Sequence, residues 1–134
     1  MSESAITGRC FCGRISFVVR GPEKFACFCY CESCQRAAGA PLVAWATYER
    51  DKFSVTQGEV HYYRSSPGVT RGLCSNCGSS ITYENEKRPN DIDITLNTFD
   101  EPTAPAPRAH IWTEDKQSWL RIADDLPVYE KNIG

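Results

Sequence analysis

The sequence has no apolar run that approaches the roughly 20 residues a membrane-spanning helix requires. Residues 1–6 have neither a basic start nor an apolar core, so they do not form a secretory signal. The chain also has no internal repeat and no low-complexity tract. We therefore expect a cytoplasmic protein with no membrane association.

Lysine and arginine are too scattered to form a basic surface. The chain has 15 basic and 17 acidic side chains, which gives a net charge of −2, and it has no run of Lys and Arg. Because nucleic acids are bound through clustered positive charge, this composition disfavours a nucleic-acid partner. A small-molecule partner is favoured instead.

The length of 134 residues and the hydrophobic fraction of 41% are typical of one domain with a hydrophobic core. We expect a single domain over residues 1–134, with residues 1–8 flexible. Short runs rich in β-branched and aromatic residues predict strands at 14–19, 42–48, 53–55, 60–63, 69–73, 80–83 and 92–98. The pattern predicts a mainly β fold of antiparallel sheets, either a sandwich or an open barrel. One short helix is expected over 32–38, and a proline-rich loop over 101–107.

Cysteine, by contrast, is abundant. The eight cysteines form three groups: Cys10 and Cys12; Cys27, Cys29, Cys31 and Cys34; Cys74 and Cys77. Cys-x-Cys and Cys-x-x-Cys spacings let two thiolates converge on one metal ion. In a reducing cytoplasm this pattern favours zinc over four disulfides, and zinc is also favoured over an iron–sulfur cluster.

The first and last groups together predict a closed zinc site. Cys10, Cys12, Cys74 and Cys77 would supply four sulfur ligands. A tetrahedral four-cysteine site of this kind is structural. Because it would join two distant segments, the binding energy of the metal would become folding energy.

The middle group predicts a second zinc site, and the spacing does not decide whether this site has three or four cysteine ligands. Cys29, Cys31 and Cys34 offer three ligands and a vacant fourth position, which is the pattern of a catalytic zinc. Three thiolates leave this centre with a net charge near −1, so it suits the capture of a thiol as thiolate better than the activation of water. If the chain is extended from residue 27 to 31, Cys27 could supply the fourth sulfur, and the site would be structural.

These motifs resemble the glutathione-dependent formaldehyde-activating enzyme family, whose domain is shared with centromere protein V. The resemblance covers roughly residues 7–130. It rests on Cys10-x-Cys12-Gly13, on Cys29-x-Cys31-x-x-Cys34-Gln-Arg-Ala-Ala-Gly, and on Cys74-x-x-Cys77-Gly78. Ile92-Asp-Ile-Thr, His110-Ile-Trp and the segment 125–129 support it.

The resemblance implies a zinc-pinned β fold related to that of a Rab-binding accessory factor, with two zinc ions per chain. It places a structural zinc on the first and last cysteine groups. It places a catalytic zinc on Cys29, Cys31 and Cys34, which favours leaving Cys27 out. The implied activity is of carbon–sulfur lyase type, in which a thiol such as glutathione adds to or leaves a small aldehyde such as formaldehyde. The alternative is a non-enzymatic protein-interaction module in which both zinc sites are structural.

Three further residues bear on the transfer of this activity. Tyr30 stands where members of the family commonly carry His. His110 is a candidate proton donor or substrate contact, although a lone His beside apolar residues is more often structural. Arg36 follows the cysteines closely and is a candidate for binding a substrate carboxylate.

Overall fold

The computed structural model describes residues 4–101 and 105–133 of the chain. The strands in these residues are β1 (Ala5–Arg9), β2 (Ser16–Arg20), β3 (Phe25–Cys29), β4 (Val43–Glu49), β5 (Phe53–Gln57), β6 (His61–Ser66), β7 (Val69–Leu73), β8 (Ser80–Asn85), β9 (Asp91–Thr95) and β10 (His110–Ile111). The helices are α1 (Glu32–Ala38) and the 3₁₀ helices η1 (Arg50–Lys52), η2 (Leu96–Thr98) and η3 (Thr113–Asp115). None of these helices is long and apolar enough to span a membrane.

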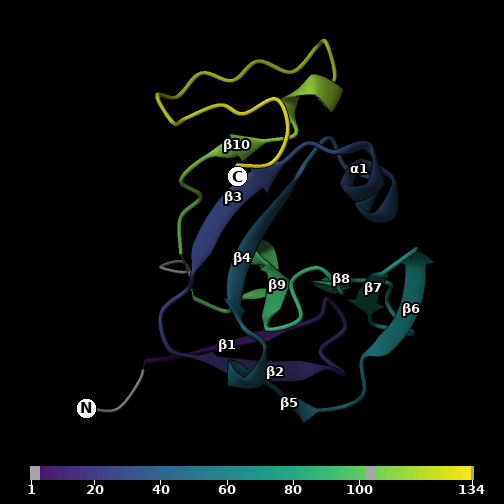
Figure 1. The fold of residues 1–134 in the computed structure, drawn as a ribbon. Coiled ribbons are helices and arrows are strands. Elements are labelled where there is room, and N and C mark those ends of the chain that lie inside the picture. Colours follow the sequence, from purple (N-terminus) through teal and green to yellow (C-terminus); the bar gives the residue numbers. More distant parts are fainter. Residues whose placement is uncertain (1–3, 102–104, 134) are drawn as a thin grey trace.

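The strands form two sheets. The small sheet has the order β1-β2-β5 and the large sheet has the order β10-β3-β4-β9-β8-β7-β6. All pairs are antiparallel except β10 with β3, which is parallel. In Figure 1 the small sheet lies at the bottom of the view, and α1 lies at the top, where β3 ends. The prediction of a mainly β fold of antiparallel sheets with one short helix is confirmed.

The main core fills the space between the two sheets. Phe17 of the small sheet packs against Phe53 at 5.4 Å and against Phe99 at 5.7 Å between ring centroids. The large sheet contributes Tyr48, Ile81, Ile92 and Ile94, all with 1% exposure or less. Burying one such side chain contributes about 1.5–3 kcal/mol, so this cluster holds the small sheet against the large one.

The helix has the predicted bounds because a capping residue lies at each of its ends. At the N-terminus, the sulfur of Cys31 accepts a hydrogen bond from the backbone N–H of Cys34. At the C-terminus, Gly39 adopts the left-handed conformation with φ of 61°.

Three sequence expectations need correction or comment. The predicted strand 92–98 ends at Thr95 and continues as η2. The strands β1, β3 and β10 were not predicted, and β1 begins inside the segment 1–8 that was expected to be flexible. Residues 102–104 of the expected loop 101–107 lie outside the described part of the chain.

Gly8 of β1 lies where the structure leaves no room for a side chain. A Cβ atom at this position would lie 2.2 Å from the ring of Phe17 and 2.6 Å from the carbonyl oxygen of Thr98. We therefore expect Gly8→Ala to lower the free energy of unfolding by about 1–3 kcal/mol, because neither the buried ring nor the backbone can move away freely. Urea denaturation measures this change. Thr7→Ala, on the exposed side of the same strand, is the control and should cost less than about 1 kcal/mol; an equal cost would contradict the close approach.

Candidate metal centres

The first centre joins a turn of each sheet. Cys10 and Cys12 lie between β1 and β2, and Cys74 and Cys77 lie between β7 and β8. Their four sulfur atoms lie within 4.8 Å of one another, with 3.6 Å from Cys10 to Cys12 and 3.8 Å from Cys12 to Cys74. Zinc–sulfur bonds of about 2.3 Å in a tetrahedron put the sulfurs about 3.8 Å apart. This donor set therefore fits a closed zinc site.

A hydrogen bond to Cys77 of this cluster favours thiolate, the form that binds metal. The Ser79 hydroxyl, 3.2 Å from the sulfur of Cys77, donates to it and lowers its pKa to about 5. The backbone N–H of Ile15 donates to the sulfur of Cys10 at 3.3 Å. Ser79 also accepts the backbone N–H of Phe11 at 2.9 Å, which is a direct link between the two turns.

The second centre comes from one continuous segment. Cys29 ends β3, Cys31 is the N-cap of α1, and Cys34 lies in the first turn of that helix. Their three sulfurs lie within 4.8 Å of one another. The strand-to-helix turn is what brings them together, because α1 folds back so that Cys34 faces the end of the strand.

The charges at this centre suit a cation. Hydrogen bonds from the thiols of Cys29 and Cys31, with help from Arg71, lower the pKa of Cys34 to about 3. The same hydrogen bonds, together with burial, raise the pKa of Cys29. One thiolate is thus shared among three sulfurs, and all three can be deprotonated together only if a cation neutralises them. The three sulfurs therefore fit a metal ion.

Cys27 stands apart from this group. Its sulfur is not among the three that lie within 4.8 Å of one another, although the side chain lines the same cleft. Cys27 and Cys29 are two residues apart on β3, a spacing of roughly 7 Å along a strand, and the chain turns away only after Cys29. Burial raises the pKa of Cys27 to about 12, so it is a neutral thiol.

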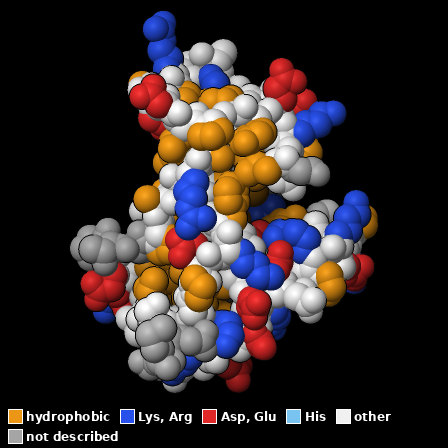
Figure 2. Space-filling model, turned by 60° about the vertical axis from the view of Figure 1, so that its left-hand side comes forward, with side chains coloured by type: hydrophobic (Ala, Val, Ile, Leu, Met, Phe, Trp, Pro, Cys, Tyr) orange, Lys and Arg blue, Asp and Glu red, His pale blue; other side chains and the backbone are white. Residues whose placement is uncertain are grey.

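The three sulfurs open into a cleft of about 730 Å³, which is in the range of small-molecule sites. Its apolar wall includes Trp45, Tyr83, Ile111 and Trp112. Its charged groups lie among them: Lys24, Glu32, Arg71, Arg88, Asp91, Asp93 and Asp115. Figure 2 shows Lys, Arg, Asp and Glu side chains interspersed over one face of the molecule, as the balanced charge of the sequence suggested.

Arg71 is a residue of this cleft that no sequence pattern singles out. It lies on β7, is 4% exposed, and points its Nη2 at the sulfur of Cys34 at 4.0 Å. Its guanidinium lies over the ring of Tyr83, 4.9 Å from the centroid, and the two residues are direct cross-strand neighbours. An arginine in a strand usually faces solvent, so only the fold reveals this position.

His110 and Tyr30 are buried residues in a chain of hydrogen bonds that ends at the exposed Asp124, and neither of them lines the cleft. The Tyr30 hydroxyl is 2.7 Å from Nδ1 of His110, and Nε2 of His110 is 2.9 Å from the Asp124 carboxylate. The hydrogen bond from His110 lowers the pKa of Asp124, whose carboxylate accepts from Nε2–H, while Nδ1 shares a hydrogen bond with the Tyr30 hydroxyl. Both ring nitrogens of His110 are occupied by the protein, and its ring stacks on Phe28. This arrangement supports a structural role for His110 and for Tyr30.

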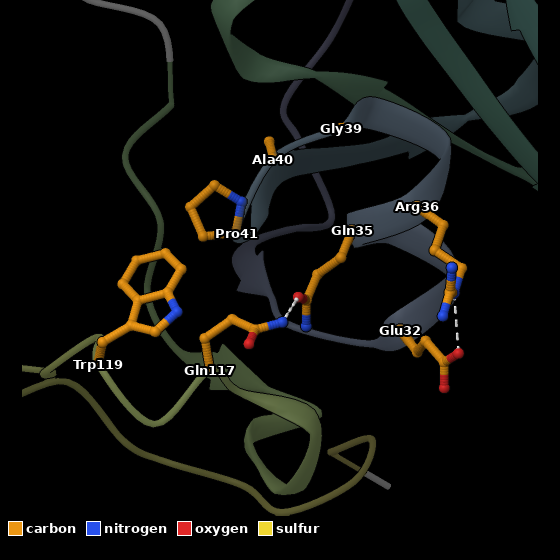
Figure 3. A pocket seen from close by; sticks show the side chains of 8 residues that line it. All are labelled: Glu32, Gln35, Arg36, Gly39, Ala40, Pro41, Gln117 and Trp119. Carbon is orange, nitrogen blue, oxygen red and sulfur yellow. Dashed lines mark hydrogen bonds and ion pairs between the residues drawn. The ribbon is translucent and has the colours of Figure 1, made fainter.

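Arg36 lies on the outer side of α1, beside a second cleft of about 460 Å³. Its side chain is 80% exposed and pairs with Glu32 at 2.9 Å. Figure 3 shows Arg36 turned toward Glu32 and away from Gln117 and Trp119, which line the same cleft. The structure does not bring Arg36 to the three sulfurs.

A family model described as glutathione-dependent formaldehyde-activating enzyme matches residues 5–115. The chain belongs to this family. No curated protein matches it. A crystal structure of a Rhodobacter sphaeroides protein, a structural genomics target, is similar with a TM-score of 0.61 and 19% identity, over 72% of this chain and 92% of that one. This likeness concerns the fold.

Within the family pattern, Tyr30 in place of the common His supplies the hydroxyl that His110 binds.

The hydrogen-bond chain predicts the effect of Tyr30→Phe. The change leaves Nδ1 of the buried His110 without its partner and should lower the free energy of unfolding by about 1–3 kcal/mol, measured by urea denaturation. The metal content should not change, because the hydroxyl points to His110. Tyr63→Phe, at a half-exposed tyrosine of β6, is the control and should have little effect. Loss of metal without loss of stability would contradict the structural role.

Proposed function

We propose that this chain is a zinc-dependent enzyme of carbon–sulfur lyase type that joins a small thiol to a small aldehyde or separates them. The observation that carries the proposal is the group of three cysteine sulfurs that opens into a cleft while Cys27 lies outside the group. The family to which the chain belongs supports glutathione as the thiol and formaldehyde as the aldehyde.

Two zinc ions per chain are part of this proposal. Cys10, Cys12, Cys74 and Cys77 would hold a structural ion, and Cys29, Cys31 and Cys34 would hold the catalytic one. The catalytic ion, when bound, supplies a Lewis-acid position at which a thiol ionises at neutral pH.

The reaction itself needs no oxidant and no further reactant. The thiol sulfur forms a bond to the aldehyde carbon, the carbon–oxygen π bond breaks, and the oxygen takes a proton to give a hydroxymethyl thioether. The thiol proton lost at the start balances the proton gained at the end. The acids Asp91 and Asp93 of the cleft are held in ion pairs, so we expect both protons to be exchanged with water.

The apolar residues of the cleft contribute to binding of the substrate. Trp45, Ile111 and Trp112 line the cleft beside the sulfurs and would contact the carbon atoms of the substrate. The alternative function, a protein-interaction module with two structural zinc ions, requires a fourth protein ligand at the second centre. The position of Cys27 disfavours that alternative.

Replacing one sulfur of the second centre tests the activity. We expect Cys34→Ser to lower the rate of adduct formation from thiol and formaldehyde at least about 100-fold, because the three-sulfur set is broken. Cys27→Ser is the matched control and should keep the rate within a few-fold. An unchanged rate in the Cys34 variant would refute the enzymatic role of this centre, and an equal loss in both variants would make Cys27 part of it.

Matched changes at the two centres should also separate their roles. We expect Cys74→Ser to lose the structural ion and to lower the melting temperature strongly, since the binding energy of a structural zinc is folding energy. Cys31→Ser should lose one zinc per chain with a much smaller change in melting temperature. Zinc analysis together with thermal unfolding followed by circular dichroism measures both effects. Equal destabilisation by the two variants would contradict the division of roles.

A further inference from the structure

The cleft contains a buried positive charge that lacks a carboxylate partner among the described residues. Arg71 is 4% exposed, and the contacts found for its guanidinium are the ring of Tyr83 and the sulfur of Cys34. A guanidinium has five N–H donors, and the sulfur, at 4.0 Å, is a distant acceptor for one of them. Burying a charge with so few partners is costly unless something else completes its surroundings.

The acids of the cleft do not complete them, because they are engaged elsewhere. Arg88 pairs with Asp93 at 2.7 Å and with Asp91 at 3.3 Å, and Lys24 also pairs with Asp91. On the opposite side, Glu32 pairs with Arg36. Asp115 accepts the backbone N–H of Glu32 at 3.2 Å. Arg71 therefore has N–H donors left, beyond the one directed at Cys34, to bind an anion that enters the cleft.

We propose that Arg71 binds the carboxylate of an acidic thiol, so that the cleft selects thiols that carry a carboxylate. This inference rests on the proposed function, since it takes the thiol as the ligand of the three-cysteine centre. A guanidinium matches a carboxylate with two parallel N–H donors, and such charge-assisted pairs are the strongest hydrogen bonds in proteins. The contact with Cys34 places this anion position directly beside the three sulfurs.

Tyr83 fixes the position of the guanidinium. Arg71 and Tyr83 are paired across β7 and β8, and the ring of Tyr83 in turn contacts Trp45 of β4 at 5.9 Å between centroids. The cation thus lies over the ring of Tyr83, which itself packs at a tilt against Trp45. A preformed donor of this kind loses little conformational freedom on binding, which increases its selectivity.

The test compares two thiols that differ only in charge: 3-mercaptopropionate and its neutral amide, 3-mercaptopropionamide. Binding is followed on cobalt-loaded protein by the change in the cobalt–thiolate absorption, so no turnover is needed. We expect the wild-type protein to bind the carboxylate thiol about 10- to 100-fold more tightly than the amide. Arg71→Met should reduce this ratio to about threefold or less, while Arg71→Lys should keep part of it.

Arg36→Met is the matched control, because it removes a positive charge that lies two residues after Cys34 in the sequence but outside the cleft. It should keep the wild-type ratio. Equal affinity for the two thiols in the wild-type protein would overturn the inference even if the Arg71 variants did not fold. An unchanged ratio in Arg71→Met protein of native circular dichroism would overturn it as well. If neither thiol changed the cobalt spectrum, the proposed function itself would fail, which is a distinct result.

Discussion

The convergence of four sulfurs from two turns is the constraint on which the rest of the structure depends. One turn belongs to the small sheet and the other to the large sheet, and 62 residues separate Cys12 from Cys74. Four thiolates packed this closely would repel one another. A metal ion bound by them would remove this repulsion and would link the two sheets. The apolar core behind them, with Phe17 against Phe99, then holds the two sheets in a fixed relation.

The strand β7 relates the two centres to each other. It carries Arg71, which faces the second group of sulfurs, and it leads three residues later into Cys74 of the first group. A metal ion bound by the first group would therefore help to fix the strand that positions the cation of the cleft. The second group is local, since a strand end, a helix cap and a helix turn supply it within six residues. Under the proposed function, the site that joins distant segments would contribute stability, and the site built from one segment would contribute chemistry.

Most of the fold could be predicted from residue patterns, and the exceptions have physical reasons. The helix Glu32–Ala38 was predicted because its two end signals are local in sequence. The strand β3 was missed because its cysteines were interpreted as ligands rather than as strand residues, and β1 because it is largely exposed. The cysteine groups could be selected from spacing alone. The position of Arg71 and the contact of His110 with Asp124 depend on tertiary packing, for which the sequence carries no local signal.

The most direct test of the account is the removal of zinc from fully loaded protein by a chelator, with and without excess thiol. The account predicts two zinc ions per chain that leave at clearly different rates, because three protein ligands hold an ion less firmly than four. The thiol should change the rate for the faster ion and leave the slower one unaffected. Two ions that leave at one rate, with no effect of the thiol, would contradict the open centre and favour two closed structural sites.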